Sequence, residues 1–161
     1  MVKFLSTLAL AAGLAASASA SAGNTYNLGT LPAGVTDFGI YQVNGTFSDT
    51  IDFTLSNMSN LSAGVGTLNF SLGGTPYKNI SDLDLTLYTA GGTDLGSGTD
   101  ITLHNLSAGG YYAVISGIAN GSAGGEYGGA ISVSAVPEPG TVAMMLAGMG
   151  LLGYIATRRK V

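Results

Sequence analysis

Residues 47–56 read Phe-Ser-Asp-Thr-Ile-Asp-Phe-Thr-Leu-Ser, so apolar and polar side chains alternate along this part of the chain. A β-strand sends successive side chains to opposite faces of its sheet, and the alternation is therefore typical of a strand with one buried face. The run Leu83-Asp-Leu-Thr-Leu87 repeats the pattern, with Asp84 and Thr86 expected to face solvent. The body of the chain is therefore predicted to consist of strands.

Shorter runs with strand character lie at residues 65–72, 101–103, 111–116 and 131–133, and no helical period is visible between 23 and 136. Paired glycines can supply the positive φ angles of tight turns. They are Gly73-Gly74, Gly91-Gly92, Gly109-Gly110, Gly124-Gly125 and Gly128-Gly129. Regularly spaced short strands with turn signals predict an all-β fold, an antiparallel β-sandwich of about seven to nine strands. The alternative is a disordered stalk rich in Gly, Ser, Thr and Asn, but disordered segments rarely keep apolar residues in strict alternation.

The C-terminal residues 137–161 have a different character. Three parts follow one another: Pro137-Glu138-Pro139, an uncharged apolar run from Thr141 to Thr157, and the cations Arg158, Arg159 and Lys160. As a helix, the apolar run would span roughly 25 Å, just short of a hydrocarbon core of about 30 Å. The cations would stay in the cytoplasm and leave the body outside. The run is predicted to be a transmembrane helix, with a buried core helix as the alternative.

In this order, the Pro-Glu-Pro triplet, the glycine-bearing apolar run and the basic tail resemble the PEP-CTERM sorting signal of Gram-negative bacteria. The resemblance implies processing near the triplet by an exosortase, which is a membrane cysteine transpeptidase. It also implies export through the inner membrane, transient anchoring by the helix, and a final location at the cell surface or outside the cell. Proteins of this family accompany exopolysaccharide and biofilm systems.

The N-terminal residues agree with export. Met1-Val-Lys3 is a short basic start, Phe4 to Ala16 is apolar, and small residues in Ala-x-Ala spacing follow. This pattern predicts a secretory signal peptide over residues 1–22, cut after Ala20 or Ala22, with an uncleaved anchor as the alternative. The predicted division is therefore a signal peptide at 1–22, an extracytoplasmic domain at 23–136 and a sorting signal at 137–161.

The charge of the body differs from that of the whole chain, whose formal net charge is −4. Between residues 23 and 139, Lys78 is the only basic side chain against nine carboxylates, which leaves a side-chain charge of −8. Nucleic-acid binding needs clustered Lys and Arg on phosphates and is excluded for such a body. The chain has no Cys, so a disulfide framework and a thiol nucleophile are also excluded.

Three further stretches of the body carry a second resemblance: residues 82–88, 91–95 and 106–117. They are similar in order to the bacterial pre-peptidase C-terminal domain, a jelly-roll-like β-sandwich that is appended to secreted proteases and other exported proteins. In addition, Phe47, Asp49 and Ile51 resemble the signature of the FxDxF group of PEP-CTERM proteins. Ile51 stands where that signature has Phe, although Phe53 follows on the same side of the strand.

The body offers little for catalysis. His104 is the only histidine, and no Gly-x-Ser-x-Gly elbow marks a nucleophile, so no catalytic residue and no enzymatic activity are expected. One His and no Cys also leave no zinc site. Calcium is the remaining option for a cofactor, because the carboxylates of Asp82, Asp84, Asp94 and Asp100 could converge, yet no Asp-x-Asp-x-Asp-Gly loop is present. No metal ligands are assigned.

Six tyrosines of the body could form a face on which sugars stack, or they could close the ends of the core. They are Tyr41, Tyr77, Tyr88, Tyr111, Tyr112 and Tyr127. Two functions follow. The first is a non-enzymatic envelope or extracellular-matrix protein that an exosortase sorts and processes. The alternative is a carbohydrate-binding or calcium-stabilised adhesive module that binds extracellular polysaccharide.

Overall fold

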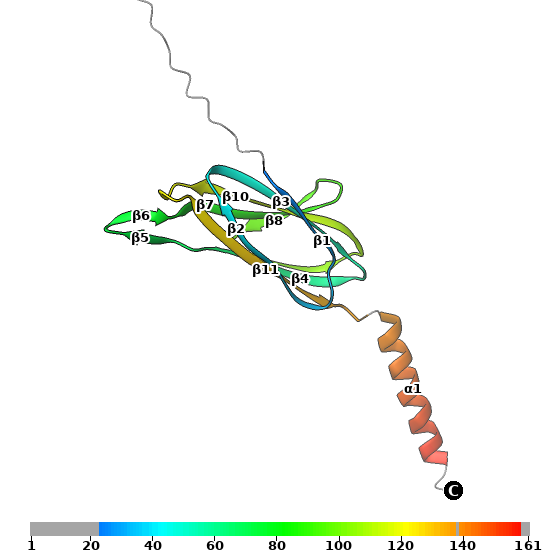
Figure 1. The fold of residues 1–161 in the computed structure, drawn as a ribbon. Helices are drawn as coiled ribbons and strands as arrows, with labels where there is room; N and C mark the ends of the chain where they lie inside the picture. The colour runs from blue at the N-terminus through cyan, green and yellow to red at the C-terminus, as the bar shows by residue number, and fades with distance from the viewer. Residues whose placement is uncertain (1–22, 138, 159–161) are drawn as a thin grey trace, which may run out of the picture.

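The computed structural model describes residues 23–137 and 139–158, and within them the chain forms a β-sandwich followed by one helix (Figure 1). The predicted signal peptide, together with Glu138, Arg159 and Lys160, lies outside the described residues. The strands are β1 Thr25–Thr30, β2 Gly34–Val43, β3 Gly45–Leu55, β4 Ser59–Thr67, β5 Phe70–Leu72, β6 Thr75–Lys78, β7 Ile80–Thr89, β8 Asp94–Gly98, β9 Asp100–Leu106, β10 Gly109–Ala119 and β11 Gly125–Ala135. The helix is α1 Pro139–Arg158.

The strands form two packed sheets and one hairpin. The five-stranded sheet has the order β1-β3-β10-β7-β8, the four-stranded sheet has the order β2-β11-β4-β9, and β5 pairs with β6. The predicted all-β sandwich is confirmed, and its two sheets together contain nine strands.

One strand pair departs from the antiparallel prediction. Strand β1 pairs with β3 in parallel, with Thr25 opposite Thr50 and Tyr26 opposite Ile51. The reason is the path of the chain, because β2 between them belongs to the opposite sheet. A chain that crosses to the other sheet and returns comes back in its original direction, whereas a tight hairpin reverses it.

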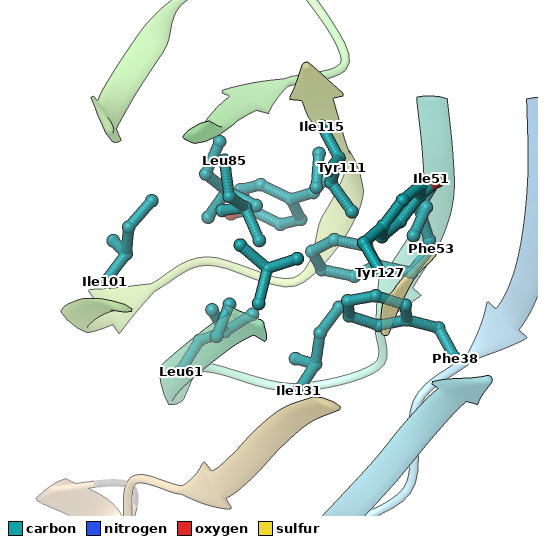
Figure 2. Close-up of a cluster of buried hydrophobic side chains, with 14 of the residues drawn as sticks. Phe38, Ile51, Phe53, Leu61, Leu85, Ile101, Tyr111, Ile115, Tyr127 and Ile131 are labelled. Atoms are coloured by element: carbon teal, nitrogen blue, oxygen red, sulfur yellow. The ribbon is translucent and has the colours of Figure 1, made fainter. Parts of the chain in front are cut away.

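The core lies between the two sheets. Strand β3 sends Phe47, Asp49, Ile51, Phe53 and Leu55 inward, as its alternation requires. Figure 2 shows side chains from both sheets meeting there. Leu85 and Ile115 from the five-stranded sheet, and Leu61 and Ile131 from the four-stranded sheet, are all fully buried. Helix α1 contributes no buried side chain among its described positions, so the sandwich holds its core by itself.

The predicted strand at residues 65–72 is in fact divided between two elements. Strand β4 ends at Thr67 and β5 begins at Phe70. Between them, the side chain of Asn69 accepts the N–H of Ile80 at 3.0 Å and donates to the carbonyl of Ile80 at 3.4 Å. Asparagine can replace a backbone partner in this way, and the strand is interrupted where it does so.

The paired glycines serve two different purposes. Gly73 and Gly74 have φ angles of 58° and 82° and form the tight turn of the β5–β6 hairpin, as predicted. The prediction of a turn at Gly128-Gly129 is wrong, because both residues lie inside β11. A Cβ atom at Gly129 would overlap the carbonyl oxygen of Gly64 and the ring of Phe38. Glycine is therefore needed there for close packing and not for a turn.

Strands β1, β2, β6 and β8 were not expected from the sequence. Strand β2 shows why, because only Phe38 and Val43 along its ten residues are buried. It forms one edge of its sheet. Its apolar residues therefore do not follow the period of two that reveals a half-buried strand.

Candidate functional site

The sorting segment follows the sandwich almost without a linker. Strand β11 ends at Ala135, and the N–H of Val136 donates to the carbonyl of Met58 at 3.0 Å. Pro137 comes next, and α1 begins at Pro139. The Pro-Glu-Pro triplet is thus placed where the folded body ends and the helix starts.

Helix α1 has the dimensions of a membrane span. It contains 20 residues, which at about 1.5 Å per residue gives roughly 30 Å, the thickness of a hydrocarbon core. The segment Gly140–Arg158 has a mean hydropathy of 1.5, and none of it is buried in the protein. Large apolar side chains such as Met144 and Leu152 are 75% and 68% exposed. An apolar helix without a protein partner is stable where lipid surrounds it.

The helix is longer than the run from Thr141 to Thr157 that the sequence predicted. It begins two residues earlier because proline fits the first helical position, where its missing N–H needs no intrahelical partner. At the other end, the guanidinium of Arg158 lies 5.4 Å from the centre of the Tyr154 ring. An aromatic residue and a cation together at a helix end are typical of a membrane–water interface.

The signature residues Phe47, Asp49 and Ile51 are all buried in β3, with exposed fractions of 4%, 1% and 0%. Asp49 connects separate parts of the fold. Its Oδ2 accepts the hydroxyl of Tyr127 at 2.6 Å, and its Oδ1 accepts the N–H of Asn24 at 2.8 Å. Because Tyr127 belongs to the four-stranded sheet, this carboxylate joins the two sheets and the segment before β1.

Asp49 is predicted from the sequence only as part of the family signature, without a structural role. The inward direction of Asp49 is nevertheless visible in the sequence. In an alternating strand, Asp49 lies on the same side as Phe47, Ile51 and Phe53, because an even number of positions separates it from each of them. An inward carboxylate requires buried donors, because a charge without partners in the interior is costly. Neither the N–H of Asn24 nor the hydroxyl of Tyr127 could be identified as that donor from spacing alone.

Aromatic rings surround this carboxylate. Ring centres are 5.3 Å apart for Phe47 and Tyr127, 5.5 Å for Tyr41 and Tyr127, and 4.0 Å for Tyr26 and Tyr41. Burial, the hydrogen bond to Asp49 and the charge of Asp49 raise the pKa of Tyr127 far above its ordinary value. Burial, followed by the charge of Asp49, also raises the pKa values of Tyr26 and Tyr41. All three tyrosines thus remain protonated at neutral pH.

Lys78, the one basic residue of the body, forms an ion pair. Its Nζ lies 2.9 Å from Oε1 of Glu126, and the amide of Gln42 donates to the same oxygen at 2.8 Å. The hydrogen bond from Gln42, then that from Lys78, lowers the pKa of Glu126. The lysine is therefore engaged in a structural contact.

The polar residues considered for chemistry are dispersed. His104 is exposed on β9, and across 23–137 and 139–158 no three His, Cys, Asp or Glu side chains are close enough to hold a metal ion. Asp84 accepts the hydroxyl of Thr86, and Asp94 accepts the N–H of Gly96. Asp82 lies at a β-bulge with a φ angle of 54°. The carboxylates of Asp82, Asp84, Asp94 and Asp100 therefore do not form one cluster in the described part of the chain.

The tyrosines divide into three groups. Tyr111 and Tyr127 are core residues, and Tyr41 packs against the core beside Tyr127. Tyr77 lies on the β5–β6 hairpin against Phe70. Only Tyr88 and Tyr112 share the solvent-facing side of the five-stranded sheet, where their rings stack.

Comparisons with known proteins address both parts of the chain. Three similar solved structures each cover 70% or 71% of this chain. The pre-peptidase C-terminal domain of a Bacillus anthracis collagenase shows 18% identity and a TM-score of 0.42, over 71% of this chain and 98% of that one. PliG from Aeromonas hydrophila, a periplasmic inhibitor of g-type lysozyme, shows 17% identity and a TM-score of 0.42, over 70% and 100%. PliG from Salmonella Typhimurium shows 16% identity and a TM-score of 0.40, over 70% and 100%.

No curated protein matches the chain in sequence. The family description that matches is the PEP-CTERM protein-sorting motif, at residues 135–160. This range begins at the last residue of β11 and includes all of α1. The prediction of a sorting signal is confirmed, and the chain carries a PEP-CTERM protein-sorting motif, which implies export that depends on an exosortase.

Proposed function

We propose that this chain is a non-enzymatic protein of the envelope or extracellular matrix of a Gram-negative bacterium. Helix α1 holds it in the inner membrane after export, and an exosortase cuts near Pro137-Glu138-Pro139. The β-sandwich then reaches the cell surface or the extracellular space. There it associates with exopolysaccharide in a biofilm.

The observation that carries this proposal is the junction between the sandwich and the helix. The matched motif covers the point where the last strand gives way to an exposed apolar helix of membrane length. The core of the sandwich lies between Leu31 and Val133, so a cut at the triplet removes no core residue. Processing can therefore release an intact domain.

The N-terminal side supports the same view. Asn24 donates to Asp49, and its carbonyl accepts the N–H of Thr50 at 2.7 Å. Asn24, two residues after Ala22, is thus already held by the sandwich. Removal of a signal peptide after Ala20 or Ala22 leaves every one of these contacts in place.

A non-enzymatic role is supported by the dispersed polar residues. His104 is exposed, and two of the carboxylates considered for metal binding, Asp84 and Asp94, accept hydrogen bonds from residues two positions further along the chain. An acidic body with these features suits a structural or binding role.

The test is the intact mass of the protein, purified from a host that has its exosortase and from the same host without it. With the enzyme, the mass should fall to that of a chain lacking the signal peptide and most of residues 137–161. A variant with Pro137→Ala and Glu138→Ala should keep its C-terminus. Pro32→Ala, which alters an exposed proline outside the motif, should be processed normally. An identical C-terminus in both hosts would overturn the sorting part of the proposal.

A further inference from the structure

One row of side chains crosses the outer face of the five-stranded sheet and takes one residue from each strand. In spatial order the residues are Asn27, Asp52, Tyr112, Tyr88 and Asp94, which are paired successively by the register of the strands. Their inward neighbours, such as Phe53, Tyr111 and Leu87, belong to the core. The row therefore points away from the core.

The two tyrosines at the centre of the row form a stacked pair. Their ring centres are 5.0 Å apart and their planes differ by 15°. Tyr88 covers one face of the Tyr112 ring, and Asp52 lies on the other side of Tyr112 in the row. Both tyrosines are only partly buried, so the pair is not required to fill the core.

A hollow of about 310 Å³ lies beside Tyr112, on the side of Asp52 and Asn27. The backbone around it leaves this space because Ala90 and Gly110, which also line it, have little or no side chain. Its lining thus combines an aromatic ring, a carboxylate and an amide. Ligand sites in proteins characteristically combine apolar or aromatic walls with a few polar groups.

We propose that this row is a binding site for a neutral polysaccharide chain; the proposal rests on the exopolysaccharide association of the proposed function and names its site. A sugar ring has an apolar C–H face and equatorial hydroxyls. Tyr112 would accept the C–H face, since tyrosine offers a flat apolar surface with a polar tip. Asp52 and Asn27 would bond the hydroxyls of the same ring, with the charged acceptor forming the stronger bonds.

The length of the row favours a polymer as the ligand over a single sugar. Neighbouring strands lie about 4.8 Å apart, so four spacings give roughly 19 Å, enough for several sugar rings in line. Its charge selects a neutral polymer. Asp52 and Asp94 lie on either side of the tyrosine pair, in a body of side-chain charge −8. A polymer of uronic acids or phosphates would be repelled.

The test uses the full chain in detergent micelles and affinity electrophoresis in gels that contain dextran, galactomannan, hydroxyethyl cellulose or alginate. At least one neutral polysaccharide should retard the protein, and alginate should not. Tyr112→Ala and Asp52→Ala should each weaken binding by about tenfold or more, as expected for central binding residues. Tyr77→Ala removes a tyrosine from the β5–β6 hairpin and should retain full binding.

Absence of retardation in all three neutral gels would overturn the site, and so would equal retardation of Tyr112→Ala and the parent chain. Stronger binding to alginate would overturn the charge argument and with it the proposed ligand class. Far-UV circular dichroism of each variant separates lost binding from lost folding. The intact mass of the same variants reports exosortase processing, so failure of this site is distinguishable from failure of the sorting proposal.

Discussion

The hydrogen bond between Asp49 and Tyr127 should make a measurable contribution to the stability of the sandwich. Both side chains are 1% exposed, so water cannot replace the Tyr127 hydroxyl when it is removed. In Tyr127→Phe, the carboxylate keeps the N–H of Asn24 but loses its 2.6 Å partner. A hydrogen bond to a charged group contributes about 1.5–3 kcal/mol, and we therefore expect a loss of about 2 kcal/mol in the free energy of unfolding.

The assay is urea unfolding of residues 23–136, followed by tyrosine fluorescence because the chain has no Trp. With a slope of about 2 kcal/mol per molar urea, the midpoint should fall by about 1 M. The same substitution is then made in an Asp49→Val background. There the hydroxyl has no acceptor to lose, so Tyr127→Phe should be nearly neutral and the coupling energy should be about 2 kcal/mol.

Tyr41→Phe is the matched control, because it removes a hydroxyl from the same aromatic group without touching the bond to Asp49. It should change stability by less than about 0.5 kcal/mol. Two results would contradict a stabilising hydrogen bond between Asp49 and Tyr127. One is a loss from Tyr127→Phe that is equal in both backgrounds, and the other is a loss from Tyr41→Phe as large as that from Tyr127→Phe.

Three further predictions concern pH, packing and the membrane. The raised pKa of Tyr127 means that the unfolded chain releases this proton above about pH 10 while the folded chain keeps it. The stabilisation that this group contributes is therefore fully present below about pH 10 and is lost as the pH rises further. Tyr127→Phe should reduce the alkaline fall in the free energy of unfolding by up to about 1.4 kcal/mol per pH unit, measured by urea unfolding between pH 9 and 11. Gly129→Ala should lower the free energy of unfolding by about 1–3 kcal/mol, because its Cβ would overlap the Gly64 carbonyl. Gly66→Ala is the control and should leave the free energy of unfolding unchanged, because a Cβ atom there would meet no other atom within 4 Å. Equal losses from the two variants would contradict the packing argument. Met149→Arg places a charge near the middle of α1 and should raise the free energy of membrane insertion by about 2.5–3.5 kcal/mol. Unprocessed protein should then move from the membrane pellet to the soluble fraction, whereas Met149→Leu should leave it in the pellet. Retention of the arginine variant in the pellet would argue against a membrane-spanning α1.

Much of the fold could be predicted from residues 47–56 and 83–87, because a strand with one buried face shows its periodicity directly. The elements that the sequence does not predict are those whose apolar residues do not show this periodicity. Strand β2 buries only Phe38 and Val43 along its length, and the apolar run at 65–72 hides the interruption at Asn69. The pair Gly128-Gly129 has the composition of a turn but serves close packing.

The two candidate sites also differ in whether the sequence can predict them. The sorting segment is a local signal, since the triplet, the apolar helix and the basic tail are contiguous, and its apolar character follows from the sequence alone. The row from Asn27 to Asp94 is not local, because its five residues come from strands whose order in the sheet is not their order in the chain. The sequence supplied six candidate tyrosines, and only strand register separates Tyr88 and Tyr112 from those that fill the core or lie on the hairpin.

Composition and short-range periodicity are enough to predict the all-β class of the body, its acidic charge and the sorting motif. The folded chain is needed to see that β1 runs parallel to β3, that Asp49 joins the two sheets through Tyr127, and that two tyrosines stack on the outer face. These features depend on which strands become neighbours. That choice is made by long-range packing between residues such as Asp49 and Tyr127, which are 78 positions apart in the chain.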